Sequence, residues 1–128
     1  MTWNILPQGS TVRLVFPAYP PKSPEHLAKV LEFIYSKGLV PRYDADALDE
    51  AACFPYSNTH KRRAEDIIDA LSDLDVKAIW GFAGGSGAMQ VVDYLMRMEY
   101  APAREPIPFI GFSDLTSLHL LWSRWGWS

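Results

Sequence analysis

Short apolar runs alternate with stretches of helical periodicity along most of this chain. The runs have strand length and span residues 11–16, 39–43, 76–82 and 107–111. Strands separated by helices are typical of βαβ units, whose strands lie parallel in one sheet. We therefore predict an α/β domain with a flavodoxin-like three-layer α/β/α architecture and a mostly parallel sheet of about four strands.

The predicted helices have clear start signals and one apolar face each. Ser23 and Thr59 are the expected N-caps of the first two helices. The apolar faces follow i, i+3, i+4, i+7 spacing and comprise Leu27, Val30, Leu31 and Ile34, then Ala64, Ile67, Ile68 and Leu71, then Ala88, Val91, Val92 and Leu95, and finally Leu115, Leu118, Leu121 and Trp122. Between residues 44 and 58 the pattern is weak, and we predict only a short helix over 47–52.

Composition excludes several classes of protein. The chain has 128 residues, 48% of them hydrophobic, and a net charge of -3, which predicts one globular domain without a nucleic-acid surface. Cys53 is the single cysteine, so an internal disulfide framework is excluded. We see no signal peptide and no apolar run of membrane-spanning length. We therefore expect no nucleic-acid or membrane partner, and a cytoplasmic location.

Two serine-containing turns follow predicted strands. Ser113 lies two residues after Gly111, and Ser86 lies within a Gly-Gly-Ser-Gly sequence at 84–87. Functional sites of parallel sheets lie at the carboxyl ends of their strands, where both serines are expected. The Gly-x-Ser pattern at 111–113 is typical of a nucleophile elbow, although the later glycine of that motif is missing and an N-cap serine would fit equally. The 84–87 turn could instead offer backbone amides to an anion.

No base is evident for a serine nucleophile. The histidines are His26, His60 and His119, and none has a spacing that indicates a catalytic triad. His119 follows Ser113 by six residues on the same predicted helix, so we expect it to be a packed helix residue. The sequence contains no metal-binding cluster of His and Cys, and we expect neither a metal nor a cofactor. A flavodoxin-like anion- or nucleotide-binding module, or a catalytically inactive interaction domain, therefore remain alternatives.

Three tryptophans lie close to the end of the sequence, at Trp122, Trp125 and Trp127. They could belong to the core around the last helix. Exposed, they would form an apolar patch of the kind that usually contacts another surface. We therefore expect that a further C-terminal part belongs to the protein.

Several segments together resemble one family. Residues 76–80, the Gly84–Gly87 turn and residues 110–119 are similar to the LD-carboxypeptidase family, which includes murein tetrapeptide carboxypeptidases and microcin-immunity peptidases. The strand ending in Phe-Pro-Ala at 16–18 and the Ser-Pro helix start at 23–24 agree with it. The most specific part is the Gly-aromatic-Ser-Asp-aliphatic-Thr segment at 111–116.

The resemblance implies a function and a site. It implies that Ser113 is the nucleophile of a serine-type carboxypeptidase, and that backbone amides of Asp114 and of Gly84 or Gly85 form the oxyanion hole. The expected substrate is a peptidoglycan-derived peptide, cleaved at the L,D bond before its C-terminal D-amino acid. A second, C-terminal domain would supply the catalytic glutamate and histidine, so residues 1–128 alone would be inactive. A homodimer is also compatible with the resemblance.

Two positions depart from the family pattern. Ala83 and Ser86 stand where the family usually has arginine and tyrosine. These changes bear on the choice of substrate, but they leave the two glycines that an oxyanion hole requires.

Overall fold

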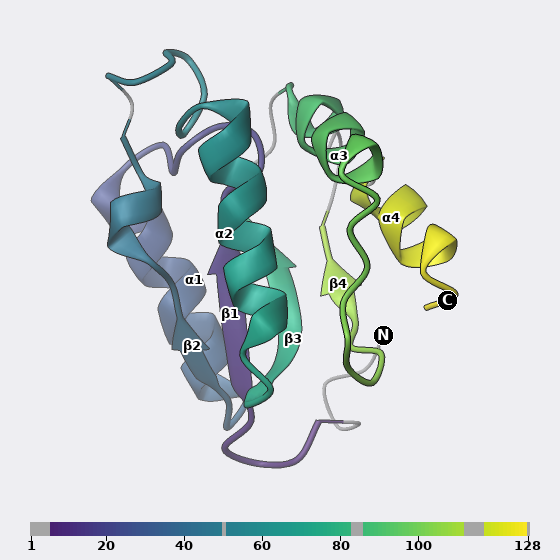
Figure 1. The fold of residues 1–128 in the computed structure, drawn as a ribbon. Coiled ribbons are helices and arrows are strands. Elements are labelled where there is room, and N and C mark those ends of the chain that lie inside the picture. The colour runs from purple at the N-terminus through teal and green to yellow at the C-terminus, as the bar shows by residue number, and fades with distance from the viewer. Residues whose placement is uncertain (1–5, 50, 83–85, 112–116, 128) are drawn as a thin grey trace.

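One parallel sheet forms the centre of the fold. The computed structural model describes residues 6–49, 51–82, 86–111 and 117–127. Its four strands are β1 (Thr11–Val15), β2 (Val40–Arg42), β3 (Val76–Gly81) and β4 (Phe109–Ile110). Every pairing is parallel, in the order β2-β1-β3-β4 (Figure 1). The predicted sheet is confirmed, although β4 has two residues instead of the expected five.

Helices cover both faces of this sheet. They are α1 (Pro24–Ser36), α2 (His60–Ser72), α3 (Ala88–Arg97) and α4 (His119–Arg124). Figure 1 shows α1 on one side of the sheet, with α2, α3 and α4 on the opposite side. The three-layer α/β/α architecture predicted from the sequence is therefore confirmed.

The side chains of β1 divide between two cores. Because successive residues of a strand point to opposite faces, Val12 and Leu14 pack with Ile34 of α1, whereas Val15 packs with residues of α2 and α3. The larger core contains the buried face predicted for the third helix, namely Ala88, Val91, Val92 and Leu95. The apolar faces of α1 and α3 thus pack against opposite faces of the sheet.

Side-chain hydrogen bonds cap the first turns of α1 and α2. The Ser23 hydroxyl accepts from the amide of His26 at 3.1 Å, and the Thr59 hydroxyl accepts from the amide of Arg62 at 3.2 Å. Both predicted N-caps are confirmed. These bonds satisfy amide groups that have no partner inside the first helical turn.

The segment before α2 differs from the prediction. It contains the 3-10 turn η2 (Ala45–Ala47) in place of the short helix expected over 47–52. The Asp44 carboxylate accepts from the amide of Asp46 at 2.9 Å and caps this turn. Beyond it, the amide of Asp49 donates across the loop to the carbonyl of Ser57 at 2.7 Å.

The tryptophans near residue 127 belong to the core. Trp122 and Trp127 are only 4% and 8% exposed, and the Trp122 indole donates to the carbonyl of Ile107 at 2.7 Å. Trp125 contacts both rings. Of the two alternatives considered from the sequence, core packing is therefore the one that holds for Trp122 and Trp127, because residues of this domain cover them. None of the described helices is long and apolar enough to cross a membrane.

Candidate active site

The strand order of the sheet indicates where a ligand would bind. From β1 the sheet continues to β2 on one side, and from β3 it continues to β4 on the other. Ligands of open parallel sheets bind beyond the carboxyl ends of the two strands where the order reverses. Here that point lies between β1 and β3, whose last residues, Val15 and Gly81, are direct neighbours.

The predicted catalytic residues lie outside the described residues. Gly84 and Gly85 follow β3 in sequence, and Ser113 and Asp114 follow β4. The register of these strands pairs Trp80 with Ile110, so both segments continue from adjacent carboxyl ends of the sheet. The roles of these four residues, and the nucleophile elbow indicated at Ser113, stay predictions.

The residues on either side of the Gly84–Gly85 segment are held firmly. Before it, the amide of Phe82 donates to the carbonyl of Val15 at 2.8 Å, and the Phe82 ring is 1% exposed. After it, Gly87 has a φ of 102° and is the N-cap of α3. A Cβ atom at Gly87 would lie 2.5 Å from the Tyr56 ring. Glycine is therefore required here both by the backbone conformation and by this close approach.

Ser86, the alternative nucleophile, is exposed. Its hydroxyl lies 3.4 Å from the hydroxyl of Tyr19. A serine nucleophile is activated by an adjacent general base, usually an imidazole. The described contact of Ser86 is a phenol, so the described geometry does not favour Ser86 over Ser113.

A buried arginine of α2 connects the loops at the carboxyl ends of β1 and β3. The Arg63 guanidinium donates to the carbonyl of Pro17 at 2.7 Å and to the carbonyl of Gly87 at 3.0 Å. It also donates to the Asn58 carbonyl at 3.0 Å and to the Gln90 side chain at 2.7 Å. Pro17 follows β1 and Gly87 follows β3, so Arg63 spans the two sides of the position where the strand order reverses.

The environment of Arg63 is unusual for a cation. The residue is 2% exposed, and its guanidinium carbon lies 4.6 Å from the centre of the Tyr56 ring. Burial lowers the pKa of the Arg63 guanidinium, which nevertheless stays charged at neutral pH. Within residues 6–49, 51–82, 86–111 and 117–127, no carboxylate forms an ion pair with it. Carbonyl and amide oxygens compensate the charge instead.

Sequence reasoning missed Arg63. Its position in the sequence could have revealed it, because Arg63 lies four residues before Ile67. It therefore shares a face of the predicted helix with Ile67 and Leu71. A charge on an apolar helix face is rarely buried unless it has partners.

The three histidines lie in separate places. The His26 ring packs against Phe82 with a centroid distance of 5.0 Å, and the His60 ring packs against Tyr94 at 5.7 Å. His119 packs against Phe109, and its Nε2 atom lies 3.2 Å from the Phe109 carbonyl oxygen. His119 thus contacts Phe109 from the start of α4, but it is exposed rather than the packed helix residue expected from the sequence.

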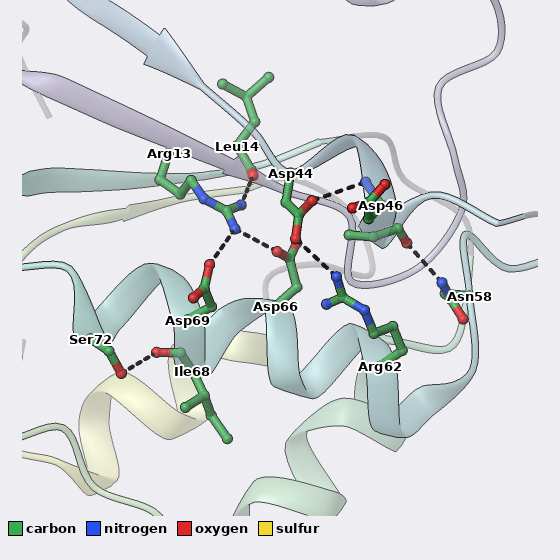
Figure 2. A network of polar contacts seen from close by, with 11 residues as sticks. Arg13, Leu14, Asp44, Asp46, Asn58, Arg62, Asp66, Ile68, Asp69 and Ser72 are labelled. Carbon is green, nitrogen blue, oxygen red and sulfur yellow. Dashed lines mark hydrogen bonds and ion pairs between the residues drawn. The ribbon is translucent and has the colours of Figure 1, made fainter.

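A group of three carboxylates was also missed. Among the described residues, Asp44, Asp66 and Asp69 have oxygens within 4.8 Å of one another, a separation compatible with a metal ion. Figure 2 shows that two arginines already engage them. Arg13 lies 2.6 Å from Asp66 and 3.1 Å from Asp69, and Arg62 lies 2.9 Å from Asp44. We interpret this group as an ion-pair network that joins α2 to the sheet.

Comparison with known proteins defines the family. Residues 12–128 match the family model of the LD-carboxypeptidase N-terminal domain. The chain belongs to this family. The resemblance seen in the sequence is thereby confirmed, and this LD-carboxypeptidase N-terminal domain can be compared with individual relatives.

Two relatives are proteins assigned as carboxypeptidases. One, from Streptomyces coelicolor, is 34% identical over 115 residues, which are 89% of this chain and 36% of the relative. Another, from Rickettsia prowazekii, is 40% identical over 60 residues, which are 46% of this chain and 18% of the relative. The chain thus matches well under half the length of either protein.

Solved structures share the fold. An MccF-like protein from Bacillus anthracis superposes with a TM-score of 0.77 at 24% identity, covering 94% of this chain and 36% of that one. A muramoyltetrapeptide carboxypeptidase from Oxalobacter formigenes superposes with a TM-score of 0.70 at 20% identity, covering 91% of this chain and 37% of that one. At these identities the likeness establishes the fold alone.

Proposed function

We propose that residues 1–128 are the nucleophile-bearing domain of a serine-type LD-carboxypeptidase. The observation that carries this proposal is the family match over residues 12–128, which includes the Gly-Phe-Ser-Asp segment at 111–114. Its place in the sequence supports the proposal, because the segment follows β4, which pairs in parallel with β3. A second domain would complete the enzyme with a glutamate and a histidine.

In the proposed mechanism, the Ser113 hydroxyl attacks the carbonyl carbon of the bond to be cleaved. Its proton passes to the histidine of the second domain, which the glutamate orients. The backbone amides of Asp114 and of the Gly84–Gly85 segment stabilise the oxyanion of the tetrahedral intermediate. The histidine then protonates the leaving amine, and water hydrolyses the acyl-enzyme to regenerate the Ser113 hydroxyl.

The proposed substrate is a peptidoglycan-derived tetrapeptide. Its bond between an L-centre and a C-terminal D-amino acid would be cleaved, with release of the D-amino acid. The family description and the muramoyltetrapeptide carboxypeptidase among the structural neighbours support this choice. The proposal requires neither a metal nor a cofactor.

An assay of D-alanine release tests this function. The full-length native protein is incubated with an L,D-linked murein tetrapeptide, beside Ser113→Ala and the matched control Ser86→Ala. We expect turnover by the wild type, loss of several orders of magnitude in Ser113→Ala, and little change in Ser86→Ala. Equal activity in Ser113→Ala would contradict the proposal. Nucleotide or phosphate binding without any hydrolysis would instead support the flavodoxin-like binding module.

A further inference from the structure

We propose that Arg63 is a positioning residue of this active site, which holds the loops after β1 and β3 in one fixed relative position. The inference rests on the proposed function, because it concerns the segment that would supply part of the oxyanion hole. Arg63 itself would not contact the substrate. Its role would be exerted through Gly87 and Pro17, the two loop residues whose carbonyl oxygens it binds.

The hydrogen bonds of Arg63 connect three separate parts of the chain. One guanidinium nitrogen, Nη1, donates both to Pro17 and to Gly87, which are 70 residues apart in sequence. The Nε atom donates to Asn58, which immediately precedes the N-cap of α2, and Nη2 donates to the side chain of Gln90 on α3. A single planar group therefore ties the loop after β1 and the start of α2 to the first turn of α3.

Only an arginine suits these contacts. The guanidinium carries five N–H donors in a rigid planar arrangement, whereas lysine offers a point charge on a flexible stem. A buried cation without a carboxylate partner is costly unless it is hydrogen-bonded. The positions of the four acceptor oxygens around Arg63 fit the planar arrangement of guanidinium donors, and loss of this side chain would leave those oxygens without their donor.

Described residues on both sides of Gly84 and Gly85 in the sequence are held by hydrogen bonds. Gly84 and Gly85 lie in sequence between Phe82 and Ser86. On one side, the amide of Phe82 is held by the carbonyl of Val15. On the other, Arg63 holds the carbonyl of Gly87. Oxyanion donors act only when they are preorganised, and a misplacement of about 1 Å can lower the rate by ~10²-fold.

Arg13 provides a matched control. It is also a buried arginine that contacts α2, but its partners are Asp66, Asp69 and the carbonyl of Leu14 within β1. Among the described residues, its hydrogen bonds go to Leu14, Asp66 and Asp69 and not to Pro17 or Gly87. Replacing Arg13 should therefore disturb the packing of α2 on the sheet without altering the proposed oxyanion hole.

The experiment compares Arg63→Ala, Arg63→Lys, Gln90→Ala and Arg13→Met in the full-length native protein. For Arg63→Ala we expect kcat per folded molecule to fall by about 10²-fold, with KM nearly unchanged, because the substrate still binds but the oxyanion donors are misplaced. Millimolar guanidinium ion should restore part of the lost kcat. Arg63→Lys should restore little, and Gln90→Ala should show a smaller decrease in kcat. Arg13→Met should lose stability and keep the wild-type kcat.

Hydrogen exchange of residues 86–90 provides a readout independent of turnover. These amides should exchange faster in Arg63→Ala and in the milder variant Gln90→Ala than in Arg13→Met. A wild-type kcat in folded Arg63→Ala, or unchanged exchange at 86–90, would overturn the inference. If Arg63→Ala does not fold, the same two measurements on Gln90→Ala decide. If the wild type itself releases no D-alanine, the proposed function fails, and the exchange measurement alone decides whether Arg63 positions this loop.

Discussion

The carbonyl oxygen of Gly87 accepts a hydrogen bond of 3.0 Å from the guanidinium of Arg63. The same glycine has a left-handed backbone and lies against the Tyr56 ring, over which the Arg63 guanidinium stacks. Arg63 of α2 and Gly87, the N-cap of α3, thus constrain each other. A substitution at either residue should therefore alter the conformation at the start of α3.

Gly87→Ala should destabilise the protein more than a glycine replacement in open space. Gly9 is the control, because its φ is +81° but a Cβ there would meet nothing within 4 Å. The backbone strain of Gly9→Ala should cost ~1–2 kcal/mol. Gly87→Ala should cost ~1–3 kcal/mol more, because the new methyl group must displace the Tyr56 ring. Urea denaturation measures both free energies of unfolding, and equal losses would contradict the close approach.

The Arg13–Asp66 ion pair should be strongly coupled. Among the described residues, Asp66→Ala leaves the buried Arg13 with Asp69 as its one carboxylate partner, and the Asp69 side chain is 71% exposed. Figure 2 shows both carboxylates beside Arg13. Breaking a buried pair on one side typically costs ~3–5 kcal/mol, whereas replacing both partners by apolar residues can be neutral. We therefore expect Asp66→Ala to be far less stable than the double variant Arg13→Met/Asp66→Leu. A single-variant loss below ~1 kcal/mol would show that the pair is not buried as described.

The stability of the fold should depend on the ionisation of Asp66. Burial raises the pKa of this carboxyl above its ordinary value of 3.8, and the hydrogen bond and charge of Arg13 oppose the rise. The folded state therefore keeps the Asp66 proton to a higher pH than the unfolded state. The contribution of this group to stability is complete below pH 3.8 and is lost as pH rises through the folded pKa.

Asp66→Asn provides the comparison for that pH effect. Its amide cannot ionise but can still accept from Arg13. The stability of the wild type relative to Asp66→Asn should decrease as pH rises from about 3.8, as measured by urea unfolding across the acid range. A relative stability that grows with pH would mean that Arg13 lowers the pKa of Asp66 more than burial raises it.

The sequence predicted what depends on local pattern. The caps at Ser23 and Thr59, the buried face of α3 and the parallel sheet follow from hydrogen bonds within one turn and from hydrophobic periodicity. It did not predict the roles of Arg63 and Asp66. Both are charged residues on a helix face, and their partners, Pro17 and Arg13, lie 46 and 53 residues away. Periodicity contains no information about such distant partners.

The same limit explains the segment between β2 and α2. Its conformation depends on bonds such as that from the Ser57 hydroxyl to the Phe16 carbonyl, which connects residues 41 positions apart at 2.7 Å. For the catalytic residues, the residues alone indicated a serine turn without a base. The family pattern, rather than physical reasoning, selected Ser113 over Ser86.

Residues 1–128 alone should not hydrolyse the tetrapeptide. A serine hydroxyl is a weak nucleophile without a general base, and proton transfer typically contributes ~10²–10⁴-fold to the rate. His26, His60 and His119 pack against Phe82, Tyr94 and Phe109 respectively. D-Alanine release by residues 1–128 at the rate of the full-length protein would show that the base lies within them, and variants of the three histidines would then identify it.

Trapping of the covalent intermediate tests the central claim most directly. The full-length protein is mixed with the murein tetrapeptide, quenched in acid during turnover, digested and analysed by mass spectrometry. The account predicts a peptidyl adduct on Ser113 that is absent from Ser113→Ala and still present on Ser113 in Ser86→Ala. An adduct on Ser86 or on any residue other than Ser113 would contradict it.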